Sequence, residues 1–77
     1  MSELPRTVDA FELIKYLVNK KGFRVKHVKG SHHILFSQDN TRRTTVTVHG
    51  NKEVRIGLLR AILLQAGIDE NEFVREF

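Results

Sequence analysis

The sequence predicts an α+β fold, a two-layer sandwich in which two helices cover one face of a three-stranded antiparallel sheet. Two stretches repeat apolar residues at helical spacing, and three short stretches between them have strand character. Three antiparallel strands need a cover on at least one face to be independently stable, and the two amphipathic helices provide it. The 77 residues are enough for one small domain, which we expect to include residues 1–77 with the second sheet face left open.

The first helix is expected to begin after Thr7 or Asp9 and to stop at Gly22. Asp9 and Glu12 have the spacing of a capping box, and both place negative charge near the positive end of the helix. Gly22 follows two lysines, and glycine after a basic last turn is a common helix end. Between these ends the apolar residues recur at helical spacing, at Phe11, Leu13, Ile14, Leu17 and Val18.

Residues 23–28 are expected to form the first strand of the sheet. Phe23 and Val25 alternate with Arg24 and Lys26 along this stretch. The alternation predicts a strand with one buried face and one basic, solvated face, so the sheet should begin with a positively charged side.

Two further strands are expected at residues 32–36 and 42–49. The turn at residues 29–31 leads into the first of them, and a polar connection at residues 38–41 joins the two as a hairpin. Threonine and valine dominate the last strand, as is typical of β-structure. Alternation gives this strand two faces, one with Thr44, Val46 and Val48 and the other with Thr45, Thr47 and His49.

His32 and His33 stand side by side at the start of the second strand. Successive side chains of a strand point to opposite faces, so the two histidines do not act as a pair. Parity groups His32 with Ile34 and Phe36, and it groups His33 with Leu35. Both groups contain apolar residues, and periodicity alone leaves open which face is buried.

A second helix and a short terminal helix complete the predicted fold. Asp69 and Glu72 repeat the acidic capping spacing, and Phe73 is expected to attach the terminal helix to the core. The second helix ends at Gly67 and has an apolar stripe formed by Ile56, Leu59, Ile62, Leu63 and Ala66. The order of helix, three strands and helix is similar to that of a double-stranded-RNA-binding domain.

Charge is distributed unevenly along the chain, whose net charge is +4. From Lys15 to Arg60 there are eleven lysines and arginines but only two acidic residues, Asp39 and Glu53. The last nine residues instead contain four acidic residues and one arginine. A basic body of this kind is typical of proteins that bind a polyanion, although a merely soluble basic protein has the same composition.

Composition also excludes several classes of protein. The absence of cysteine rules out a disulfide framework and a cysteine-based zinc site. The four histidines are an adjacent pair plus two distant ones, without nearby carboxylates, so we expect no metal and no other cofactor. No apolar run resembles a signal peptide or is long enough to span a bilayer, so we expect no membrane contact and a cytoplasmic location.

Five segments occur in the order and at the spacing of a known family. They are Gly22-Phe23, Gly30-Ser31-His32-His33, Val46-Thr47-Val48-His49-Gly50, Gly57-Leu58-Leu59-Arg60-Ala61-Ile62-Leu63, and Gly67-Ile68 before the acidic end. With these segments the chain resembles the HicA family of toxins, small mRNA interferases of type II toxin–antitoxin systems. The sequence departs from the usual family pattern at three places, with Thr47 in place of Pro, Leu58 in place of Thr, and His27-Val28 in place of Arg-Gln.

The resemblance implies an endoribonuclease in which His32 is the essential catalytic residue. Histidine suits proton transfer from the attacking 2′-hydroxyl, or to the leaving 5′-oxygen, because its ordinary pKa of about 6.5 is close to working pH. Lys29 is near enough in sequence to pair with the scissile phosphate. Gly30 lets the substrate backbone approach closely, and Ser31 offers a hydroxyl or caps the turn.

Further contacts to RNA are expected from basic residues along the sheet and before the second helix. Lys52 and Arg55 lie near a helix start, where backbone N–H groups also favour phosphate. Phe23 and Phe36 are able to stack on bases, but core packing is the better interpretation of both. The full set of expected basic contacts is Lys26, Lys29, Arg42, Arg43, Lys52 and Arg55.

Three functions are compatible with these features. The first is a metal-independent mRNA interferase whose HicB-like antitoxin protein covers the histidine face. The second is a non-catalytic RNA-binding module that recognises the shape of A-form RNA. The third is an orphan relative kept for protein–protein contacts. The unpaired edge of a three-stranded sheet also permits a homodimer.

Overall fold

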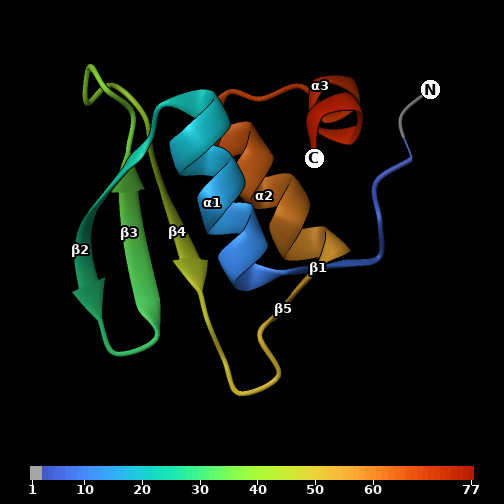
Figure 1. Cartoon of the computed structure of the whole chain (residues 1–77), viewed down its shortest axis with the longest axis horizontal. Coiled ribbons are helices and arrows are strands. Elements are labelled where there is room, and N and C mark those ends of the chain that lie inside the picture. The colour runs from blue at the N-terminus through green and yellow to red at the C-terminus, as the bar shows by residue number, and fades with distance from the viewer. Residues whose placement is uncertain (1–2) are drawn as a thin grey trace.

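The computed structural model describes residues 3–77 and has the α+β architecture predicted from the sequence (Figure 1). Its main sheet is antiparallel and has the spatial order β2-β3-β4. The strands are β2 (Arg24–Lys29), β3 (His32–Phe36) and β4 (Arg43–Thr47). The predicted three-stranded antiparallel sheet is therefore confirmed, with β4 shorter at both ends than expected.

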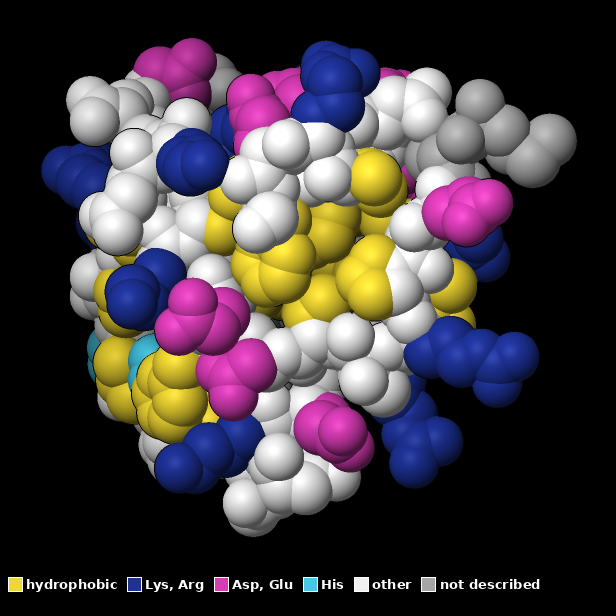
Figure 2. Space-filling view, turned by 45° about the vertical axis from the view of Figure 1, so that its right-hand side comes forward, with side chains coloured by type: hydrophobic (Ala, Val, Ile, Leu, Met, Phe, Trp, Pro, Cys, Tyr) yellow, Lys and Arg dark blue, Asp and Glu magenta, His cyan; other side chains and the backbone are white. Residues whose placement is uncertain are grey.

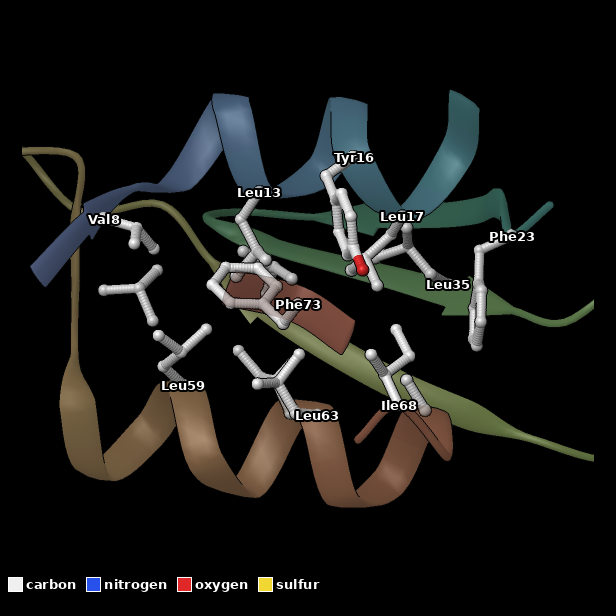
Figure 3. Packing of buried hydrophobic residues seen from close by; sticks show 14 of the residues in the cluster. Val8, Leu13, Tyr16, Leu17, Phe23, Leu35, Leu59, Leu63, Ile68 and Phe73 are labelled. Carbon is white, nitrogen blue, oxygen red and sulfur yellow. The ribbon is translucent and has the colours of Figure 1, made fainter. Parts of the chain in front are cut away.

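Helices α1 (Ala10–Lys21) and α2 (Ile56–Ala66) stand over the β4 side of the sheet, and the core fills the space between them and the strands (Figures 1 and 3). The short α3 (Glu70–Glu76) packs against α1. Phe73 of α3 is fully buried between the leucines of α1 and α2, and its ring centre lies 5.1 Å from that of Tyr16. The predicted attachment of the terminal helix through Phe73 is confirmed.

The helix ends follow the capping signals in the sequence. The Asp9 carboxylate accepts a hydrogen bond of 3.0 Å from the Glu12 backbone N–H, so Asp9 rather than Thr7 caps α1. Gly22 ends the helix with a φ of 73°, a conformation that strongly favours glycine. The apolar stripe differs from the expected one, because Phe11 is 43% exposed while Tyr16 is buried.

A second, two-stranded sheet was not predicted. β1 (Thr7–Asp9) pairs antiparallel with β5 (Glu53–Arg55), and their central residues, Val8 and Val54, face each other across the pair and are both buried. Three residues are too few to show an alternating pattern, so neither strand has a recognisable signal in the sequence. The pair connects the start of α1 to the start of α2.

The prediction that β2 has one buried face is wrong. All six of its side chains are exposed, including Val25 at 39% and Val28 at 53%. β2 is the edge strand farthest from the helices in Figure 1, and an irregularity in its pairing lies between Val25 and His27. The two valines of β2 therefore stay exposed, whereas Phe23, just before the strand, is buried as expected.

The other two strands decide which face of the sheet is covered. Leu35, Thr44 and Val46 are at most 1% exposed, so their parity faces the helices. His32 has the opposite parity and is exposed. The catalytic candidate therefore lies on the open face, which periodicity alone had left undecided.

Polar contacts as well as the packing of Phe73 hold α3 against α1. Lys21 Nζ forms ion pairs with the carboxylates of Glu72 and Glu76, and the Tyr16 hydroxyl donates a hydrogen bond of 2.9 Å to Glu76 Oε1. Burial and the nearby Glu76 carboxylate raise the pKa of Tyr16. Among residues 3–77 no helix has the length and apolar character needed to cross a membrane.

Candidate active site on the open sheet face

Lys29, His32 and Thr47 form one row across the end of the sheet. Lys29 ends β2, His32 begins β3 and Thr47 ends β4, and in the ladder Lys29 pairs with His32 and His32 with Thr47. Directly opposed residues of antiparallel strands project to the same face, with β-carbons roughly 5 Å apart. The row therefore places an ammonium group, an imidazole and a hydroxyl beside one another on the open face.

The Gly30-Ser31 turn fixes the alignment of Lys29 with His32. Only these two residues connect β2 to β3, and Gly30 has a φ of 59°, as expected for a tight hairpin with glycine at its first position. The space where a Gly30 side chain would stand is empty to 4 Å, so the turn is open to an approaching ligand. The Ser31 carbonyl accepts a 2.8 Å hydrogen bond from the Val48 N–H, which ties the turn to the chain leaving β4.

Among the described residues, the imidazole of His32 has one side-chain hydrogen-bond partner. Its Nδ1 lies 3.1 Å from Thr47 Oγ1, which leaves the second ring nitrogen, Nε2, for a ligand on the open face. A histidine held in this way is able to take or give a proton at Nε2 while Nδ1 keeps its hydrogen bond. The chemistry available at the row is therefore acid–base catalysis beside a positive charge.

His33 has a different environment from His32. It faces the helices, where its ring and the Phe11 ring form a T-shaped, edge-to-face contact with 6.1 Å between ring centres. Its Nδ1 is buried and has no hydrogen-bond partner among the described residues. The adjacent histidines are thus separated by the sheet, and only His32 faces the open side.

Basic side chains continue along the open face from the row. Phe36, at the far end of β3, has Lys26 Nζ at 5.0 Å and Arg43 Cζ at 5.9 Å from its ring centre. The expectation of core packing for Phe36 is wrong, because the ring lies on the open face beside these two cations. Strands β2, β3 and β4 contain no acidic residue, whereas acidic and basic side chains are mixed on the side of the molecule shown in Figure 2.

The remaining predicted contacts lie away from this face. A β-carbon added to Gly67 would stand 2.5 Å from Arg42 Cζ, so the Arg42 guanidinium rests against the end of α2. Lys52 Nζ lies 5.8 Å from the centre of the Phe11 ring of α1, and Arg55 belongs to β5 and precedes α2. The structure therefore brings Lys26, Lys29 and Arg43 to the open face with His32, and it leaves the other three basic residues elsewhere.

Two residues of the open face were missed by the sequence reasoning. The contact between Thr47 and His32 depends on the register of the β3–β4 hairpin, in which fifteen positions separate the two residues. His27 pairs with Ile34, which places it in the row next to Lys29 and His32. The strand alternation indicated the face of Thr47, but only the register identifies its partner.

A metal centre is not assembled by the described residues. No group of three or more His, Cys, Asp or Glu side chains within residues 3–77 is placed to hold a metal ion. The four histidines are divided between the two faces of the sheet and its loops, and the row at His32 contains no carboxylate.

Comparison with known protein families agrees with this arrangement. The family model described as the HicA toxin of bacterial toxin–antitoxin systems matches residues 11–68, which include the whole three-stranded sheet, α2 and all of α1 except its first residue. A comparison with curated proteins found no match, and neither did one with solved structures. Because the family model matches most of the chain, from α1 through the end of α2, the chain belongs to the HicA toxin family.

Proposed function

We propose that this toxin is an mRNA interferase, a metal-independent endoribonuclease in which His32 is the general acid/base. The observation that supports the proposal is the row of Lys29, His32 and Thr47, which presents an exposed and oriented imidazole next to a cation. The family to which the chain belongs supports the toxin role.

The proposed reaction uses the 2′-hydroxyl of the RNA as the nucleophile. A base removes its proton, the 2′-oxygen attacks phosphorus, and the bond to the 5′-oxygen breaks as that oxygen acquires a proton. The products are a 2′,3′-cyclic phosphate and a 5′-hydroxyl. His32 Nε2 takes the first proton or supplies the second, and one such group contributes typically about 10²–10⁴-fold to the rate.

The positive charge of Lys29 has a separate part in the proposal. Negative charge grows on the phosphate oxygens as the new bond forms, and a nearby ammonium group stabilises it. Lys29 is opposite His32 in the ladder, so one phosphate is able to reach both side chains. Gly30 leaves room beside them for the RNA backbone.

Beyond the row, Phe36 and the two cations beside its ring are proposed as the RNA-binding part of the open face. Phe36 lies four residues from His32 along β3, which corresponds to about 13 Å. Lys26 and Arg43 flank its ring, and these cations suit phosphate groups on either side of a stacked base. We propose that the antitoxin inhibits the toxin by covering this same face.

The direct test compares wild type with His32→Ala on single-stranded mRNA in the presence of EDTA. We expect cleavage by the wild type, a loss of about 10²-fold or more in His32→Ala, and RNA binding within a few-fold of wild type. His33→Gln is the matched control, because it alters the neighbouring histidine on the other face. Its cleavage should stay near the wild-type level.

Three results would contradict the proposal. Cleavage that persists in His32→Ala would exclude His32 as the acid/base. Binding without cleavage by the wild type would favour the non-catalytic RNA-binding module, for which the same basic face is sufficient. A substrate with 2′-deoxyribose at the cleaved position should resist the wild type, and its cleavage would exclude attack by the 2′-oxygen.

A further inference from the structure

We propose that Thr47 is a positioning residue for His32, whose hydroxyl holds Nδ1 so that Nε2 is the ring atom presented on the open face. The consequence for catalysis rests on the proposed function. The orientation of the ring does not, because it follows from a contact that is independent of any substrate, with Nδ1 and Thr47 Oγ1 3.1 Å apart.

The hydroxyl of Thr47 is on a rigid part of the molecule. Val46, the preceding residue, is fully buried under the helices, and the N–H of Val48, the following residue, donates to the Ser31 carbonyl at 2.8 Å. The β-branched side chain of threonine restricts χ1 and so limits where Oγ1 can lie. His32 is exposed, and without this contact its ring would be free to turn about χ2.

A hydroxyl suits a histidine that changes its protonation state. It has one O–H donor and two acceptor lone pairs, and it rotates to present either. When Nδ1 has a proton, the ring donates to Oγ1; when Nδ1 lacks one, the hydroxyl donates to the ring. The contact therefore survives while Nε2 takes up a proton and returns it.

Lys29, the other neighbour of His32 in the row, is unable to do this. An ammonium group has three donors and no acceptor, so it has nothing to offer a protonated ring nitrogen. Its stem is also flexible, and all of β2 is exposed at the sheet edge. The positioning role therefore falls to Thr47, and charge stabilisation falls to Lys29.

The first readout is single-turnover cleavage by three variants. Thr47→Val removes the hydroxyl with little change in shape, Thr47→Ser restores it, and Thr45→Val makes the same change on the same strand and face, opposite Ile34. We expect Thr47→Val to lower the single-turnover rate constant at saturating protein by about three- to tenfold, with the half-saturating protein concentration unchanged, as the loss of one neutral hydrogen bond predicts. Thr47→Ser and Thr45→Val should stay near wild type.

The second readout needs no RNA. Nitrogen-15 NMR of the imidazole rings reports which ring nitrogen has the proton. Exposed His27, whose side chain has no hydrogen bond to any of residues 3–77, serves as an internal reference. In Thr47→Val we expect the His32 ring signals to move toward those of His27, while in Thr47→Ser and Thr45→Val they should stay at their wild-type positions.

The two readouts separate the failure of this inference from the failure of the proposed function. If the wild type does not cleave RNA, the proposed function fails, and the NMR result alone decides whether Thr47 orients the ring. Unchanged His32 signals in Thr47→Val would overturn the inference in either case. In a protein that cleaves, full activity in Thr47→Val, an equal loss in Thr45→Val, or no rescue by Thr47→Ser would overturn it as well.

Discussion

The helix-covered and open faces of the sheet are built by alternate residues of the same strands, but they are stabilised in different ways. On the covered face Leu35 and Val46 have no exposed surface and pack under the helices. On the open face His32 is exposed and is held by one hydroxyl. One set of alternate residues therefore stabilises the fold, and the other set is available for catalysis and binding. Mutations on the covered face should lower stability, and mutations on the open face should lower activity.

The adjacent residues His32 and His33 show this division, because they lie on opposite faces of the sheet. His33 contacts the Phe11 ring on the helix side, and its Nδ1 has no partner among the described residues. His32 lies between Lys29 and Thr47 on the other side. Residue type alone does not distinguish them, because the environment comes from strand parity and from which face the helices cover.

The largest effect on stability is expected from Leu35→Ala, with Ile34→Ala as its neighbour on the open face. Leu35 is fully buried, so its truncation should lower the free energy of unfolding by about 2–5 kcal/mol. Ile34 is only partly buried, and its truncation should cost less than about 1.5 kcal/mol. Urea unfolding measures both free energies, and equal losses of stability in the two variants would contradict the difference between the faces.

A smaller effect is expected on RNA binding from Arg43→Gln, with Arg42→Gln as the adjacent control. Arg43 lies beside Phe36 on the open face, whereas Arg42 rests against Gly67 on the helix side. Losing one phosphate contact should make the plot of log binding constant against log salt concentration less steep, by about 0.7–1 in slope. Arg42→Gln should leave the slope unchanged. A larger change in Arg42→Gln would place RNA on the other side of the molecule.

The smallest effect is expected from lowering the pH, which should weaken the attachment of α3 on the helix side of the molecule. Hydrogen bonds from Lys21 and Tyr16 lower the pKa of Glu76 below its ordinary value of 4.5. A carboxyl whose pKa is lower in the folded state adds stability above the unfolded pKa, and this contribution is lost as the pH falls through the folded pKa. Because the Glu76 side chain is only partly buried, the contribution should be modest.

Glu76→Gln provides the control for this acid effect. Thermal unfolding measured from pH 7 down to pH 3 should show a shallower loss of Tm in Glu76→Gln than in wild type. The Nδ1–Thr47 contact of His32 is on the other face, so the substitution should leave the His32 ring signals unchanged. An identical pH dependence in the two proteins would mean that Glu76 does not contribute to the attachment of α3.

Local signals in the sequence were sufficient for the helices and for the strand that contains His32. Asp9, Gly22 and Gly67 act at helix ends through their own side chain or backbone conformation, so neighbouring residues are enough to predict them. The β1–β5 pair was missed because three-residue strands form only through contacts between distant segments. Such contacts leave no periodic pattern within either segment.

The composition of the site was harder to predict because it depends on faces and register. Arg42 and Arg43 are adjacent basic residues, and only the three-dimensional fold sends one to the helix side and the other to the open face. Phe36 was expected in the core because apolar residues usually lie there, but its strand parity points it away from the helices. The Thr47–His32 contact likewise needed the hairpin register.

The most direct test of the open face as the RNA site is to map a bound RNA onto side chains whose face of the sheet is known. We propose NMR titration with a single-stranded, 2′-O-methylated RNA, which lacks the nucleophilic hydroxyl and so should bind without being cleaved. The His32 ring and the methyl groups of Ile34 and Thr47 should shift, while the methyl groups of Leu35 and Val46 should not. Shifts confined to the helix-side groups would contradict the assignment of the open face as the site of RNA binding and cleavage.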